Sequence, residues 1–171
     1  MDIVFVSTDG ILSNQHHLEF ISKRGINYMS IHQNQIDKEK VSLLNHLFVR
    51  SGALPVFTGT WKDQYSVSRL NEMLRKCGAN WKAQDATPYL YKLDNNKFAT
   101  PSDEIGMYLH RLYSKQITVN NFVILDHHLN NYDDYSSKVI KINYEKGLKP
   151  FHIEKALSVL GIEKKKKIVS N

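Results

Sequence analysis

The sequence predicts a single α/β domain, a three-layer sandwich in which helices cover both faces of a mostly parallel β-sheet. Short apolar runs alternate along the chain with longer segments of helical periodicity, which is typical of parallel strands connected by helices. A chain of 171 residues is long enough to bury one sizeable core. Its 42% hydrophobic and 23% charged residues are the proportions of an ordinary globular protein, so neither a disordered chain nor a coiled coil is expected.

Four apolar runs predict the strands of this sheet, because each has the length and the composition of a short buried strand. They cover residues 3–6, 54–57, 122–125 and 139–142. Helices are expected between and after them, where apolar residues recur at helical spacing behind a residue suited to the helix start. These helices cover residues 38–51, residues 63–77, a segment that begins at 101 or 102, and residues 150–161. Residues 80–100 are expected to form a loop.

Two other segments lack such a pattern. Residues 11–37 have no clean period, so they are expected to form a loop or a small cap insertion with at most one short helix. Residues 163–171 are expected to form a basic flexible tail, in which residues 164–167 are all lysine. The single domain is therefore expected to cover residues 1–162.

Charge and composition narrow the class of partner. The net charge of +6 and a pI near 9.3 favour a phosphorylated small molecule or a nucleic-acid end. Four of the positive charges belong to the tail, so no strong general field for nucleic acid is expected. Cys77 is the only cysteine, which excludes an internal disulfide and fits a cytoplasmic setting. No apolar run reaches the roughly 18 residues of a membrane helix, so no membrane association is expected.

Polar side chains follow three of the predicted strands. The three segments are residues 7–9 (Ser-Thr-Asp), 58–60 (Thr-Gly-Thr) and 126–128 (Asp-His-His). In open parallel sheets, ligands bind beyond the carboxyl ends of the strands. The functional site is therefore expected where these three segments meet.

Five motifs occur in the order and spacing of a known superfamily. They are the strand and Ser-Thr-Asp-Gly of residues 3–10, Val-Phe-Thr-Gly-Thr-Trp-Lys of residues 56–62, Asp-Glu-Ile of residues 103–105, Val-Ile-Leu-Asp of residues 123–126, and Gly-Leu of residues 147–148. Through them the chain, over about residues 2–160, resembles the haloacid dehalogenase-like (HAD-like) superfamily. It is most similar to the small, nearly capless HAD domains associated with RNA-repair proteins. The resemblance implies a Rossmannoid sheet with a minimal cap.

The resemblance also implies a phosphoryl-transfer site. Asp9 takes the position of the general acid and base, and Thr58 takes that of the hydroxyl that holds a phosphate oxygen. Gly59 and Thr60 complete that phosphate-binding segment. The basic residue expected just before residue 103 is missing, and Lys97 or Lys92 is the candidate to supply its charge from the preceding loop.

The nucleophile and metal positions are altered. The nucleophile position, an aspartate in the superfamily, is Ser7, which is a poor nucleophile without a base and gives a metal no anionic oxygen. Asp126 takes the position of the carboxylate that helps to hold Mg²⁺, with Asp9 and His127 as the other candidate metal ligands. His127 stands where a second acid often follows, which leaves Mn²⁺ and Zn²⁺ open beside Mg²⁺.

Other interpretations of these residues stay open. The run at 126–128 also resembles the Asp-His-His motif of another phosphoesterase family, although that family needs two domains. His16 or His17 in the first loop is an alternative partner for this run in a metal site. Asp133 or Asp134 is an alternative source of the second acid.

The sequence thus predicts an HAD-like phosphohydrolase-type domain with a degenerate active site, which binds phosphate and a metal and has weak or lost phosphatase activity. If the domain is an enzyme, it is expected to be a metal-dependent phosphatase or phosphoesterase. The alternative is a non-catalytic module of HAD origin that binds a nucleotide, a nucleic acid or a protein.

Overall fold

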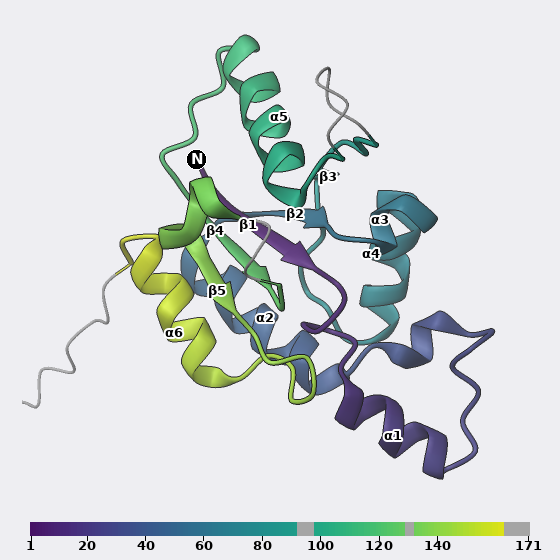
Figure 1. Cartoon of the computed structure of the whole chain (residues 1–171). Coiled ribbons are helices and arrows are strands. Elements are labelled where there is room, and N and C mark those ends of the chain that lie inside the picture. Colours follow the sequence, from purple (N-terminus) through teal and green to yellow (C-terminus); the bar gives the residue numbers. More distant parts are fainter. Residues whose placement is uncertain (92–97, 129–131, 163–171) are drawn as a thin grey trace, which may run out of the picture.

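The computed structural model describes residues 1–91, 98–128 and 132–162, and it confirms the predicted α/β class. Within these residues, five parallel strands form one sheet in the order β3-β2-β1-β4-β5 (Figure 1). The strands are β1 (Asp2–Ser7), β2 (Leu54–Thr58), β3 (Asp85–Ala86), β4 (Asn121–Asp126) and β5 (Val139–Lys141). β1 is therefore the central strand, with β2 and β4 on either side.

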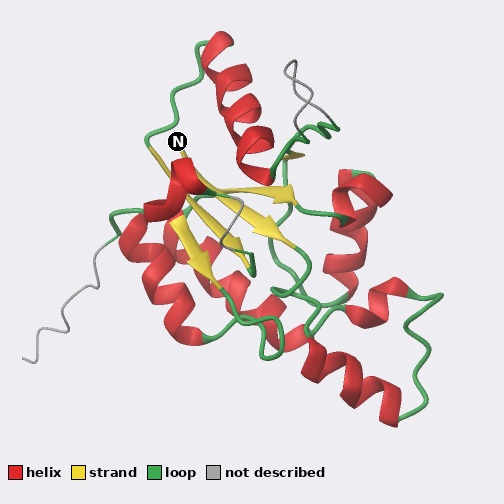
Figure 2. Ribbon diagram, in the orientation of Figure 1, coloured by secondary structure: helices red, strands yellow, loops and turns green. Residues whose placement is uncertain are grey.

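Helices cover both faces of this sheet (Figure 2). They are α1 (Gln15–Lys23), the 3₁₀ helix η1 (His32–Gln35), α2 (Lys38–Ser51), α3 (Trp61–Gln64), α4 (Val67–Lys76), α5 (Pro101–Ser114), the 3₁₀ helix η2 (Asp133–Lys138) and α6 (Pro150–Val159). Val4 and Val6 of β1 pack with α2, α4 and α6, whereas Ile3 and Phe5 pack with α5. The alternation of side chains along β1 therefore divides the core into two clusters, one on each face.

Two segments differ from the prediction. The helix expected over 63–77 is two helices, α3 and α4, because Ser66 is extended and its side chain caps α4 by accepting from the Arg69 backbone N–H. The loop expected over 80–100 contains β3, which pairs with β2 at the edge of the sheet. A strand of two residues is too short to show an alternating pattern.

Residues 11–37 contain α1 and η1 and project from the sheet (Figure 1). The two ends of this insertion are tied together, because Asn14 Nδ2 donates to Asp37 Oδ2 at 3.1 Å. Asp37 also caps α2 by accepting from the Glu39 backbone N–H. The insertion thus leaves the body after β1 and returns to it at the start of α2.

The tail predicted at 163–171 lies outside the described residues. Among the helices that are described, none combines the length and the apolar character needed to cross a lipid bilayer.

Candidate functional site

The carboxyl ends of three neighbouring strands bring the predicted site residues together. Ser7, the last residue of β1, is the register partner of Thr58, the last residue of β2. β4 pairs with the other side of β1 and ends at Asp126. All three residues are buried. Together with Asp9 and His127, which follow β1 and β4, they form what we call the strand-end site.

Ser7 packs closely against the loop that follows β2. Gly59 in that loop has a φ of +80°, and a Cβ at this position would lie 2.7 Å from Ser7 Oγ. Glycine therefore meets both the backbone conformation and the space that this approach requires. Ser7 Oγ donates a long hydrogen bond, of 3.4 Å, to the carbonyl oxygen of Asp9. None of the described histidines or carboxylates hydrogen-bonds to this hydroxyl, so it has no general base to activate it.

The carboxylate of Asp9 is held through both oxygens. Thr60 Oγ1 donates to Oδ2 at 2.5 Å, and Trp61 Nε1 donates to Oδ1 at 3.0 Å. Trp61 is buried, and its ring lies 6.1 Å from that of Tyr65 and 6.3 Å from that of His32 in η1. His32 Nδ1 is also in hydrogen-bond contact with the Tyr65 hydroxyl. The insertion therefore supports the tryptophan that orients Asp9.

Asp126 is also satisfied on both carboxylate oxygens. The backbone N–H of His128 donates to Oδ1 at 3.0 Å, the Tyr132 hydroxyl donates to Oδ2 at 2.6 Å, and His127 Nδ1 lies 3.3 Å from Oδ1. Burial acts to raise the pKa of Asp126, but the hydrogen bonds from these three residues together hold that pKa below its usual value. Burial and the nearby Asp126 charge raise the pKa of Tyr132, so its phenol stays a donor.

His127 bridges two oxygens of the site. Its Nδ1 lies 3.0 Å from the carbonyl oxygen of Asp9 and 3.3 Å from Asp126 Oδ1. Both oxygens are acceptors, so Nδ1 must carry the hydrogen. The hydrogen bond to Asp126 raises the pKa of His127 against the opposing effect of burial. Gly10 makes room for the ring, because a Cβ there would lie 2.6 Å from His127 Cβ.

The two candidate phosphate-binding hydroxyls differ in access. Thr58 is fully buried, and its Oγ1 has no hydrogen bond of good geometry within the described part of the chain, although it lies near the Tyr132 hydroxyl. Thr60 is exposed and already donates to Asp9. A phosphate that arrives from solvent therefore meets Thr60 before Thr58.

Lys62 is a further cation at the site that the sequence interpretation did not single out. Its side chain is 3% exposed, and its Nζ lies 2.7 Å from Asp63 Oδ1 and 3.2 Å from Glu104 Oε2. Thr87 Oγ1 donates to the same Glu104 oxygen at 3.3 Å. The sequence feature that could have pointed to Lys62 was the Trp-Lys pair at the end of the motif of residues 56–62.

A cavity of about 560 Å³ opens beside the strand-end site. Its lining consists of Thr60, Lys62, Asp63, Gln64, Thr87 and Tyr89. The cavity therefore combines hydroxyl groups, an aromatic ring and an ammonium group that is paired with the Asp63 carboxylate. The hydroxyl and ammonium groups can contact an anionic ligand. Lys97 and Lys92, the two candidates to supply a charge from the preceding loop, lie outside the described residues.

The donor set does not fit an oxygen-coordinated ion such as Mg²⁺, which requires several oxygen ligands in near-octahedral geometry. The Asp9 carboxylate is engaged with its two donors, and Ser7 offers a neutral hydroxyl. Over residues 1–91, 98–128 and 132–162, no three His, Cys, Asp or Glu side chains gather as a metal site requires. His17, an alternative ligand in the prediction, instead contacts the Asn34 carbonyl through Nε2 at 3.0 Å.

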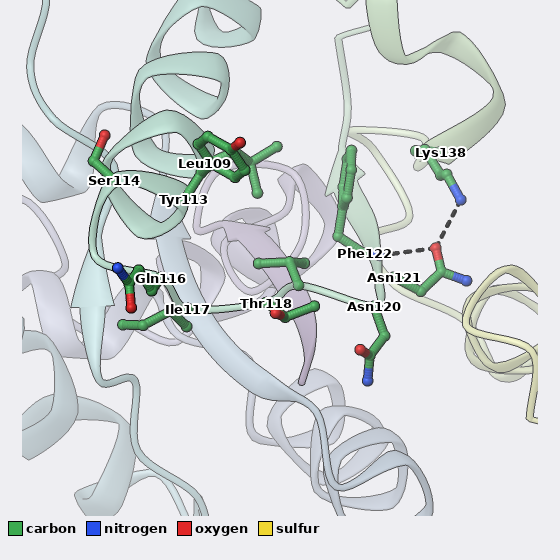
Figure 3. Close-up of a pocket in the computed structure, with 11 residues that line it drawn as sticks. Leu109, Tyr113, Ser114, Gln116, Ile117, Thr118, Asn120, Asn121, Phe122 and Lys138 are labelled. Carbon is green, nitrogen blue, oxygen red and sulfur yellow. Dashed lines mark hydrogen bonds between the residues drawn. The ribbon is translucent and has the colours of Figure 1, made fainter.

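A larger cavity, of about 860 Å³, lies at the opposite end of the sheet (Figure 3). Its lining includes Leu109 and Phe122, and Lys138 Nζ donates to Asn121 Oδ1 at 2.7 Å on one side of it. These residues belong to the start of β4 and its surroundings, whereas the strand-end site follows the end of β4. This cavity is therefore separate from the predicted site.

Comparison with known proteins assigns the family. Residues 3–153 match the family described as the HAD domain in Swiss Army Knife RNA repair proteins. No curated protein and no solved structure matches the chain. The matched range contains the parallel sheet except for its first residue, Asp2, and it contains the strand-end site. The chain therefore belongs to this family of HAD domains and is an HAD-like, phosphohydrolase-type domain, as its five motifs predicted.

Proposed function

We propose that this domain binds a phosphorylated ligand at the strand-end site and has lost most or all of the covalent phosphatase reaction. The observation that carries the proposal is Ser7, which ends β1 where the superfamily has its nucleophilic aspartate. A serine cannot form an aspartyl-phosphate, and its hydroxyl needs a base before it attacks phosphorus. The described contact of that hydroxyl is with the Asp9 carbonyl oxygen, which is no base.

The remaining groups favour binding of an anion. The cavity beside the site is lined by Thr60, which is exposed, and by Lys62, whose largely buried ammonium group also pairs with Asp63 and Glu104. Tyr89, a residue that is 64% exposed, lines the same cavity and offers a ring on which a base can stack. Two donors hold the Asp9 carboxylate in one orientation, so each of its oxygens already accepts a hydrogen bond from the protein.

A nucleic-acid end is the phosphorylated ligand that we expect. The description of the family, an HAD domain in RNA repair proteins, supports this choice. The cavity residues support it too, because a terminal nucleotide carries both a phosphate for Lys62 and Thr60 and a base for Tyr89. A phosphorylated small molecule with an aromatic part would use the same contacts.

Binding of matched oligonucleotides tests the proposal. A short single-stranded RNA with a terminal phosphate is compared with the same RNA ending in a hydroxyl, by calorimetry at low salt. We expect the phosphorylated end to bind at least about tenfold more tightly, a difference of about 1.4 kcal/mol. Lys62→Gln should remove most of that difference, whereas Lys82→Gln removes an equal charge at an exposed position outside the cavity and should leave it.

Hydrolysis of p-nitrophenyl phosphate in Mg²⁺, Mn²⁺ or Zn²⁺ tests the loss of chemistry. We expect no turnover above the uncatalysed rate. Turnover that Asp9→Asn abolishes would show that another group replaces the nucleophile, and the proposed loss would be wrong. A protein that neither hydrolyses the ester nor prefers a terminal phosphate is better explained as a non-catalytic module for a protein or for unphosphorylated nucleic acid.

A further inference from the structure

The strand-end site contains two oxygens that face a common point. The carbonyl oxygen of Asp9 and Oδ1 of Asp126 lie 3.0 Å and 3.3 Å from one and the same atom, His127 Nδ1. They come from different strand ends, β1 and β4, so the sheet itself brings them together. A cation held at this edge of the sheet would draw on these two oxygens.

We propose that the His127 ring N–H occupies this cation position, so that the strand-end site holds no divalent metal ion. Mg²⁺ binds its oxygen ligands at about 2.0–2.1 Å and demands six of them in near-octahedral geometry. A ring nitrogen between the Asp9 carbonyl and the Asp126 carboxylate leaves no room for an ion at that spacing.

The contacts around the bridge hold the ring in place. Gly10 has no side chain where a Cβ would lie 2.6 Å from His127 Cβ. The ring lies 3.8 Å from that of His128, tilted by 45° to it, and 5.3 Å from that of Tyr144, measured between ring centroids. Only 16% of the His127 side chain is exposed, so rotation away from the two oxygens would break several contacts.

The oxygens around the His127 ring already form hydrogen bonds within the protein. Asp126 accepts from the His128 backbone N–H on Oδ1 and from the Tyr132 hydroxyl on Oδ2. Ser7 supplies a neutral hydroxyl, which donates to the Asp9 carbonyl instead of adding a negative charge. Protein donors therefore satisfy the acceptors that a metal ion would need.

Metal binding tests this inference directly. It rests on the proposed function only for the location of the site, and it is measured without a phosphorylated ligand, so either proposal can fail alone. The full chain and its Asp126→Asn variant are titrated with MnCl₂ while the melting temperature is followed. We expect equal responses, because any ion bound elsewhere stabilises both proteins alike. A larger response of the unmodified chain would overturn the proposal.

A second pair of variants asks whether His127 is what excludes the ion. Ser7→Asp restores a carboxylate but keeps the histidine, whereas Ser7→Asp/His127→Ala also clears the position between the two oxygens. We expect millimolar Mn²⁺ to stabilise only the double variant. A folded double variant that responds no more than Ser7→Asp would show that His127 is not the obstacle and would overturn the proposal.

One measurement needs no variant and decides the question even if the substituted proteins do not fold. Mn²⁺ is paramagnetic and broadens the proton resonances of nearby groups. We expect the His127 ring resonances of the unmodified chain to stay sharp at Mn²⁺ concentrations that broaden exposed carboxylate residues. Selective broadening of the His127 resonances would place the ion at the strand-end site and refute the proposal.

Discussion

The close approach of Gly59 to Ser7 makes a quantitative prediction for Gly59→Ala. An alanine Cβ would lie 2.7 Å from Ser7 Oγ, but the next atoms of Ser7, Cβ and Cα, would be 3.5 Å and 3.7 Å away. The clash is therefore with the hydroxyl oxygen alone. Removing that oxygen by Ser7→Ala should leave only ordinary van der Waals contacts.

Two terms contribute to the expected loss of stability. A non-glycine residue at a φ of +80° costs about 1–2 kcal/mol. Forcing the Ser7 side chain aside in a buried region adds about 1–3 kcal/mol. Gly59→Ala should therefore lower the free energy of unfolding by about 2–5 kcal/mol in the natural sequence, and by about 1–2 kcal/mol in a Ser7→Ala background.

Urea denaturation of the four proteins in this cycle measures the coupling energy. Gly25→Ala and Gly78→Ala serve as controls, because these glycines have φ values of +68° and +96° and an added methyl group would meet nothing within 4 Å at either position. Both control substitutions should cost only the free energy of placing a non-glycine residue at a positive φ. The reasoning fails if Gly59→Ala costs no more than the controls, or if the coupling to Ser7 is below the roughly 0.5 kcal/mol by which independent sites depart from additivity.

Three further predictions concern single contacts. Trp61→Phe keeps an aromatic ring but loses the donor to Asp9, so it should lower the free energy of unfolding, measured in urea, by about 1 kcal/mol. A similar loss in an Asp9→Ala background would show that the effect comes from packing instead. Lys62→Met leaves the Glu104 carboxylate buried without its cation and should lower the free energy of unfolding by about 3–5 kcal/mol. The double variant Lys62→Met/Glu104→Gln should recover part of this loss. If the effects of the two substitutions simply add, the two residues are not paired. Burial, with help from nearby lysines, lowers the pKa of His152 from 6.5 to about 4, so the unfolded chain binds the proton more tightly. Stability should therefore fall as the pH drops from 6.5 towards 4, by about 3 kcal/mol at about 1.4 kcal/mol for each pKa unit, and a pH titration of His152→Gln should lack this component.

The sheet could be predicted from the sequence because its central strands are themselves runs of apolar residues. The runs 3–6, 54–57 and 122–125 are apolar because the strands that contain them are buried in the middle of the sheet. The start of α2 was predictable from a local cap at Asp37. The break between α3 and α4 was not, because Ser66 is as acceptable on a helix surface as at a helix start, and only its extended backbone decides.

The residues of the strand-end site could be predicted from the sequence, but the contacts between their side chains could not. Ser7, Thr58 and Asp126 were expected to meet because the ends of parallel strands share one edge, and they do. The direction of the Asp9 carboxylate depends on Trp61, which lies 52 positions further along the chain. The bridge from His127 back to Asp9 spans 118 positions. No pattern of neighbouring residues encodes such contacts.

The replacements at positions 7 and 127 are physically coupled. A second carboxylate beside Asp126 would need a strong cation between them, and a divalent ion supplies it. With the neutral Ser7 in place, one negative charge fewer remains, and donors from His127 and Tyr132 are enough to satisfy the Asp126 carboxylate. Ser7→Asp alone would add a second negative charge beside Asp126. The ring N–H of His127 cannot balance this charge as a coordinated divalent ion would. We therefore expect phosphatase turnover to return only when both positions are changed together.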